Sequence, residues 1–160
     1  MIDASALGWP ADLVGELDHR RLKAPAVKLR SATPGSKGDV VYAVDLRIRR
    51  PNAEEYLTDT ELHSVEHFLL EGFSRLLPGT FLSVGIMGCQ TGLYLGFLNE
   101  GRVPVILDTL AQILEGMQQA TAVPYANIEQ CGRWRNHSLH DAQRVAREIL
   151  ARRADWLDAA

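Results

Sequence analysis

Residues 58–77, which read TDTELHSVEHFLLEGFSRLL, carry the pattern that decides the fold. Apolar side chains recur there every three or four positions, so the segment is predicted to form an amphipathic helix. Thr58 and Thr60 are both suitable N-caps, and acidic residues in the first turn match the positive end of the helix dipole. Pro78-Gly79 ends the pattern, which limits the helix to about five turns.

Strand patterns flank this helix on both sides. Residues 40–49 alternate between two sets of side chains, as a strand with two different faces does. The predicted strands are residues 26–30, 40–49, 81–87 and 93–98, and the further predicted helices are residues 105–120 and 139–156. Strands joined by short turns and interleaved with helices predict an α+β fold, in which an antiparallel sheet packs against helices on one face.

Length and charge limit the functions that the chain can have. The 160 residues suggest one domain, residues 1–160, whose first 20 residues are irregular or arm-like. A net charge of −3 offers no basic footprint, so neither nucleic acid nor a membrane is expected as a partner. The start of the chain lacks the basic and apolar run of a signal peptide, which favours a cytoplasmic location and two free cysteines.

A candidate metal site begins on the first helix. His63 and His67 are four residues apart, so their side chains share one helical face and can bind one ion. Glu66 lies beside that face, and the later Cys131 can add a thiolate. Two imidazoles and a thiolate leave one tetrahedral position open, as catalytic zinc sites do. A histidine pair taken alone is also compatible with ordinary packing or solvation.

Cys89 stands in the glycine-flanked loop Met87-Gly-Cys-Gln-Thr-Gly92. Glycines there allow the backbone to approach a bound molecule. The thiol is either buried and inert or a proton shuttle whose pKa is lowered by a nearby cation, and its position leaves both interpretations open. His137 is a further candidate ligand or a helix cap, whereas His140 is expected to be solvated.

Three motifs in this order resemble the S-ribosylhomocysteine lyase (LuxS) family. They are His63-x-x-Glu66-His67, Met87 to Gly92, and Gln130-Cys131-Gly132 followed by His137-x-Leu139. Two earlier segments, Leu17-Asp18-His19 and Asp45-Leu46-Arg47, also resemble the family. Any one motif alone is weak, but together they extend over most of the chain.

The resemblance implies a fold akin to the inverted zinc peptidases and a homodimer with two active sites at the subunit interface, where residues 1–20 would contact the partner subunit as an arm. It implies that His63, His67 and Cys131 bind Fe²⁺, for which Zn²⁺ or Co²⁺ can substitute. The implied reaction moves a carbonyl along a ribose thioether and then expels homocysteine by β-elimination. That leaves 4,5-dihydroxy-2,3-pentanedione, the precursor of the quorum-sensing signal autoinducer-2.

The resemblance also implies roles for further residues. Cys89 and Glu66 would be the acid/base pair, and Arg47 would contact the substrate together with His19 from the partner subunit. Ser83 is a further implied substrate contact, and it stands where the family has Asp at the amino-acid end of the substrate pocket.

Three departures bear on substrate recognition: Val14 replaces a Ser, Ser83 replaces the Asp, and Gly85-Ile86 replaces Ser-Pro. Losing a charge-assisted bond to the homocysteine ammonium, worth about 1.5–3 kcal/mol, would weaken binding roughly tenfold to a hundredfold. Either other residues compensate, or the enzyme acts on a different sugar thioether.

Two other classes of protein compete with this interpretation. A metallopeptidase of the His-x-x-Glu-His type would use Glu66 to activate water and Glu148 as its third ligand, and Cys89 would have no role. A non-catalytic metal-binding module would close the site with a fourth protein ligand, for which His137 is the candidate.

Overall fold

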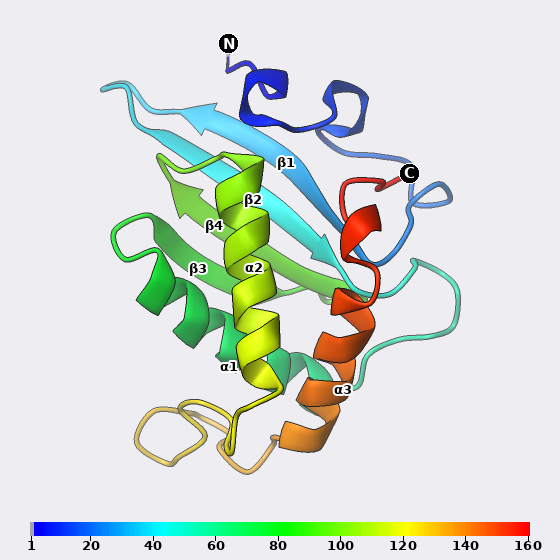
Figure 1. Cartoon of the computed structure of the whole chain (residues 1–160), viewed down its shortest axis with the longest axis vertical. Helices are drawn as coiled ribbons and strands as arrows, with labels where there is room; N and C mark the ends of the chain where they lie inside the picture. Colours follow the sequence, from blue (N-terminus) through cyan, green and yellow to red (C-terminus); the bar gives the residue numbers. More distant parts are fainter. Residues whose placement is uncertain (1) are drawn as a thin grey trace.

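The structure is a computed structural model that describes residues 2–160. Four strands form one antiparallel sheet in the order β1-β2-β4-β3, and three helices cover one face of it (Figure 1). The strands are β1 (Ala26–Pro34), β2 (Val40–Arg47), β3 (Phe81–Ile86) and β4 (Gly92–Leu98). The helices are α1 (Asp59–Leu76), α2 (Val103–Met117) and α3 (Leu139–Leu150). The predicted α+β class and antiparallel sheet are confirmed.

The core lies between the sheet and the helices. Helix α1 packs on β3 and β4, and α2 and α3 pack against α1 and against each other. Buried Phe73 of α1 stacks on Phe81 of β3 and meets Phe97 of β4 edge-on, with ring centroids 5.3 Å away in both pairs. Gly72 allows close approach of α2, since a Cβ there would lie 2.5 Å from Ile113. Helix α1 is therefore held tightly from two sides.

Helix α1 begins where the sequence offered two N-caps. The Thr58 hydroxyl accepts a hydrogen bond from the backbone N–H of Glu61, and the Glu61 carboxylate accepts one from the N–H of Thr58. This capping box satisfies two N–H groups that the first turn would otherwise leave unpaired. Thr60 is not the cap; its hydroxyl bonds Asn136 in the segment before α3.

The ends of several elements differ from the prediction. Strand β1 extends to Pro34, because its pairing with β2 continues down to Pro34 and Val40. The prediction that the last helix reaches residue 156 was wrong: α3 ends at Leu150 and a short 3-10 turn, Arg153–Asp155, follows. The break lets Trp156 turn into the core, where it is 1% exposed and donates Nε1–H to the Ile149 carbonyl.

Residues 2–20 contain two short 3-10 turns, Ser5–Leu7 and Ala11–Leu13, in otherwise irregular chain. Trp9 between them is buried, and its indole N–H bonds the carbonyl of Gly101 in the same chain. This stretch is thus anchored on its own fold at Trp9, and a role as an arm toward a partner stays a prediction. Across residues 2–160, every helix is too short or too polar to cross a membrane.

Candidate metal centre and active site

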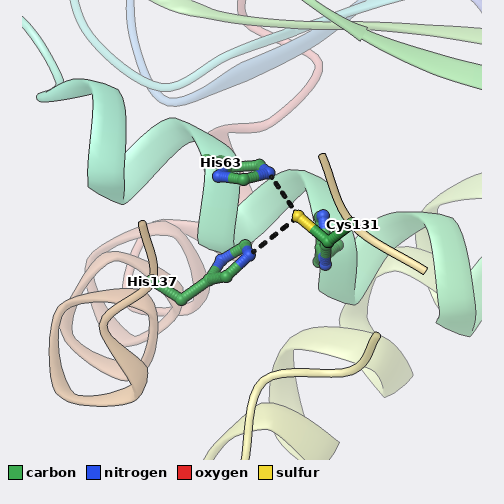
Figure 2. Close-up of side chains that lie close together, drawn as sticks. His63, Cys131 and His137 are labelled. Atoms are coloured by element: carbon green, nitrogen blue, oxygen red, sulfur yellow. Dashed lines mark hydrogen bonds between the residues drawn. The ribbon is translucent and has the colours of Figure 1, made fainter. Parts of the chain in front are cut away.

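Four possible metal ligands gather between α1 and the chain that precedes α3. They are His63, His67, Cys131 and His137, and their donor atoms all lie within 4.8 Å of one another. Cys131 Sγ is 3.5 Å from His63 Nε2 and 3.6 Å from His137 Nε2. Figure 2 shows the sulfur between these two imidazole rings. The three residues predicted as metal ligands therefore meet, although Cys131 is 68 residues from His63 in the chain.

Backbone carbonyls orient two of the histidines. His67 Nδ1 lies 2.7 Å from the Pro124 carbonyl and His63 Nδ1 lies 3.1 Å from the Asn136 carbonyl. A carbonyl can only accept, so Nδ1 of each ring carries a proton, and in the neutral ring Nε2 is then the lone pair that points into the cluster. The Asn136 amide nitrogen also approaches His63 Nδ1, at 3.3 Å, but the carbonyl is nearer.

This donor set fits a divalent transition metal. Metal–nitrogen distances of about 2.0 Å and metal–sulfur distances of about 2.3 Å place tetrahedral N and S ligands about 3.5 Å apart. The distance of 3.5 Å between Cys131 Sγ and His63 Nε2 agrees with that separation. Imidazole and thiolate are ligands that suit iron, cobalt and zinc, so the site is compatible with each of these ions.

Glu66 lies next to the cluster without joining it. Its Oε2 is 3.9 Å from His67 Nε2, and its side chain is partly exposed. Glu148, the third ligand that a metallopeptidase would need, bonds Arg49 at 2.7 Å and Arg144 at 2.9 Å and is not among the clustered donors. That pattern leaves Glu66 free for acid/base work and removes the support for a peptidase-like ligand set.

The Cys89 loop connects β3 to β4 and is tightly braced. The N–H of Met87 bonds the Gly92 carbonyl, and the N–H of Gln90 bonds the Met87 carbonyl. Gly92 is required by close approach of β2, because a Cβ there would lie 2.1 Å from the Leu46 carbonyl oxygen. These contacts hold the exposed Cys89 thiol in a defined place on the loop.

The surroundings of Cys89 favour its thiolate. Partial burial alone would raise the pKa, but hydrogen bonds from Thr91 and the Arg47 guanidinium outweigh it and lower the pKa below that of a free thiol. The Thr91 hydroxyl is 3.0 Å and Arg47 Nη1 is 3.9 Å from the sulfur. Arg47 is therefore the cation that a proton-shuttling thiolate needs. Both cysteines are unpaired, as predicted.

Two cavities adjoin the Cys89 loop. One, of about 100 Å³, is lined by His19, Arg47 and Cys89 together with buried Lys28 and Asp45. A second, more open one of about 290 Å³ is lined by His63, by residues of the loop and by other side chains. The predicted substrate contacts Arg47 and His19 thus meet around Cys89 in one chain. Ser83 is exposed on β3 and lines neither cavity.

The sequence left open whether His137 is a metal ligand or a helix cap, and it gave no sign of its partner, Ser64. The structure places His137 in the cluster, with ring centroids 4.0 Å from His63 and 4.3 Å from His67. Burial, with those two rings beside it, lowers the pKa of His137 to about 4. Ser138, not His137, caps α3, and buried Ser64 lies 3.3 Å from His137 Nδ1. No sequence pattern marks this pairing, because Ser64 and His137 are 73 residues apart in the chain.

The fold and the site together define a class of protein: a small α+β protein with a cluster of histidines and a cysteine for a metal, and a second, activated cysteine nearby. Comparison with known proteins then identifies the family. The model for S-ribosylhomocysteinase (LuxS) matches residues 15–160, and the chain belongs to this family.

Individual relatives agree with that assignment. The chain is 42% identical over 142 residues to the S-ribosylhomocysteine lyase of Halobacillus halophilus, covering 89% of this chain and 92% of the relative. It is 45% identical over 140 residues to that of Dichelobacter nodosus, covering 88% and 90%. Identity to the Helicobacter pylori protein of the same name is 38% over 140 residues, covering 88% and 89%.

Proposed function

We propose that this chain is a metal-dependent S-ribosylhomocysteine lyase, an enzyme that cleaves a carbon–sulfur bond to give homocysteine and 4,5-dihydroxy-2,3-pentanedione. The observation that carries the proposal is the convergence of His63, His67 and Cys131 in a chain of the S-ribosylhomocysteinase family. Relatives that are 38–45% identical bear the lyase name. A lyase for a different sugar thioether is the second candidate, because Ser83 replaces the expected carboxylate.

In this proposal, His63, His67 and Cys131 hold the ion, with Fe²⁺ as the resident metal and Zn²⁺ or Co²⁺ as substitutes. Support comes from the Nε2 atoms that the carbonyls of Pro124 and Asn136 leave unprotonated. When bound, the ion supplies Lewis acidity, which stabilises negative charge developing on substrate oxygen.

Cys89 and Glu66 move the protons in the proposed reaction. Each isomerisation takes a proton from one sugar carbon and returns one to its neighbour, so the carbonyl moves from C1 to C3 without a change of oxidation state overall. The ketone at C3 then acidifies the C4 proton. Its removal forms a C4–C5 double bond, the C5–S bond breaks, and homocysteine leaves as a thiolate that takes up a proton. A thiolate and a carboxylate differ in pKa, which suits successive transfers.

Arg47 and His19 are the proposed substrate contacts, whereas Ser83, the third position that the resemblance implies, lies outside both cavities. Arg47 is 6% exposed and lies against the Cys89 thiol, so its charge can also stabilise an oxyanion formed beside that sulfur. His19 is exposed at the rim of the same cavity. The resemblance implies that His19 serves the partner's site, whereas the cavity that it lines is in its own chain.

We also propose a cytoplasmic homodimer with both active sites at the interface, making an autoinducer precursor as a by-product of methionine metabolism. Large apolar and aromatic side chains are exposed on the face of the sheet away from the helices, namely Val41, Leu82 and Tyr94. Tyr94 lines the cavity of about 100 Å³ together with Cys89, so a second subunit on this face would cover the site.

The proposal is tested by release of free thiol when anaerobic, Fe²⁺- or Co²⁺-loaded protein meets S-ribosylhomocysteine. Cys89→Ala and Glu66→Gln are run beside it, with Glu71→Gln as the matched control because that residue of α1 bonds only Arg75 on the surface. Release by the wild type and control, lost in both site variants, supports the lyase. No release from protein that holds one metal per chain would keep the site and reject this substrate.

A further inference from the structure

Four donors surround a site that needs only three. The distance of 3.6 Å from His137 Nε2 to Cys131 Sγ suits two different roles. It matches two ligands of one tetrahedral ion, and it also matches a hydrogen bond from N–H to sulfur. Because the distance fits both roles, the protonation of His137 has to be decided by the partners of its other nitrogen.

For His63 and His67 that other nitrogen faces a backbone carbonyl. The carbonyls require N–H at Nδ1 and so leave Nε2 as a lone pair, which is the form that binds metal. His137 differs, because its Nδ1 faces the hydroxyl of Ser64 at 3.3 Å, and a hydroxyl can donate or accept.

The other contact of Ser64 resolves that choice. Ser64 is fully buried, and its Oγ accepts a hydrogen bond of 3.0 Å from the backbone N–H of Ser138. Within residues 2–160, the acceptor in reach of the Ser64 hydroxyl proton is His137 Nδ1. A buried hydroxyl left without an acceptor costs about 1–3 kcal/mol, so Ser64 donates and His137 Nδ1 accepts.

We propose that neutral His137 therefore carries its proton on Nε2 and donates it to the Cys131 thiolate. This inference rests on the proposed metal centre and assigns His137 as a positioning residue, not as a fourth ligand. The hydrogen bond withdraws charge from the thiolate, which strengthens the Lewis acidity of an ion bound to it. It would also keep this imidazole from filling the one ligand position that His63, His67 and Cys131 leave open.

The wild-type protein provides the first test. Long-range ¹H–¹⁵N correlation spectra of the zinc-titrated protein report which nitrogen of each histidine is protonated and which binds metal. We expect metal-bound Nε2 and protonated Nδ1 in His63 and His67, and protonated Nε2 with free Nδ1 in His137. A metal-bound Nε2 or a protonated Nδ1 in His137 would overturn the inference.

The same titration separates the two proposals. If the Nε2 signals of His63 and His67 do not shift on zinc binding, then the proposed metal centre itself fails. If those two shift while His137 shows the wrong tautomer, only the role of His137 is lost. Neither reading depends on activity, so an incorrect substrate would not affect the result.

Cobalt spectra of variants provide the second test. A hydrogen bond to sulfur lowers the energy of its lone pairs, so His137→Leu should move the thiolate-to-cobalt charge-transfer band to longer wavelength. His137→Gln retains an amide donor and should shift it less, and His140→Leu, at an exposed site, should leave it in place. An unmoved band in His137→Leu protein that still holds one cobalt per chain contradicts the hydrogen bond.

Discussion

Arg47 of β2 and Cys89 of the β3–β4 loop are 42 residues apart in the chain, and Arg47 Nη1 lies 3.9 Å from Cys89 Sγ. The same nitrogen lies 2.5 Å from the Thr91 hydroxyl oxygen, which is itself 3.0 Å from the sulfur. The guanidinium of Arg47, the hydroxyl of Thr91 and the thiol of Cys89 thus form one cluster, in which the first two are buried and the thiol is exposed. Thr91 is 1% exposed, so water cannot easily replace its contribution.

Thr91→Val should raise the pKa of Cys89. Burial raises this pKa, and the hydrogen bond with the Thr91 hydroxyl is the largest effect that lowers it. Thiolate-dependent activity is present above the pKa and lost below it, so the acid limb of kcat/KM should move to higher pH. A hydrogen bond to a charged group is worth about 1.5–3 kcal/mol, and the change removes that preference for the thiolate. Direct titration of thiolate absorbance in the metal-free protein provides the check, and an unmoved pKa would show that Thr91 has no such role.

Thr58→Ala should destabilise the fold by about 1 kcal/mol through loss of the helix cap. Helix α1 carries His63 in its second turn, so fraying of the first turn would also loosen one proposed ligand. Urea unfolding of the metal-free protein measures the change in the free energy of unfolding, and Thr58→Ser, which keeps the hydroxyl, should behave like wild type. Equal stability of all three proteins would contradict the role of the capping box.

The spacing of His63 and His67 predicted their convergence because four residues bring side chains onto one helical face. Cys131 followed from donor chemistry once that pair was recognised. The role of His137 could not be predicted, since it depends on Ser64, which points toward His137 only after α1 has packed against the chain leading into α3. The state of Cys89 was open for the same reason: Arg47 reaches it across paired strands.

The end of α3 shows the same limit. Its helical pattern continues past Leu150, and local propensity gives no reason to stop there. The structure ends the helix because Trp156 gains a buried position and a hydrogen bond to Ile149 by leaving the helical path. Burying an aromatic side chain of this size outweighs the small propensity of the few remaining residues.

Mixing His19→Ala and Cys89→Ala chains tests which subunit supplies His19. Both side chains line one cavity of a single chain, so we expect the mixed population to show no more activity than either variant alone. Each subunit of a heterodimer would then carry one defect in its own site. If His19 instead serves the partner's site, one of the two sites in the heterodimer would be intact, and activity would recover. Co-expression with two affinity tags isolates the heterodimer, and its isolation also tests the proposed dimer.

Ser83→Asp distinguishes the two candidate substrates. Ser83 is exposed on the edge strand β3 and lines neither cavity beside the Cys89 loop, so for an ordinary S-ribosylhomocysteine lyase the change should act like a surface substitution. An effect within ±0.5 kcal/mol corresponds to about a twofold change in KM. If the homocysteine ammonium lacks a partner in this protein, the new carboxylate should lower KM about tenfold to a hundredfold with little change in kcat. Ser83→Asn, which has the same shape without the charge, is the control: an improvement confined to Asp would show that this chain has diverged from S-ribosylhomocysteine as its preferred substrate.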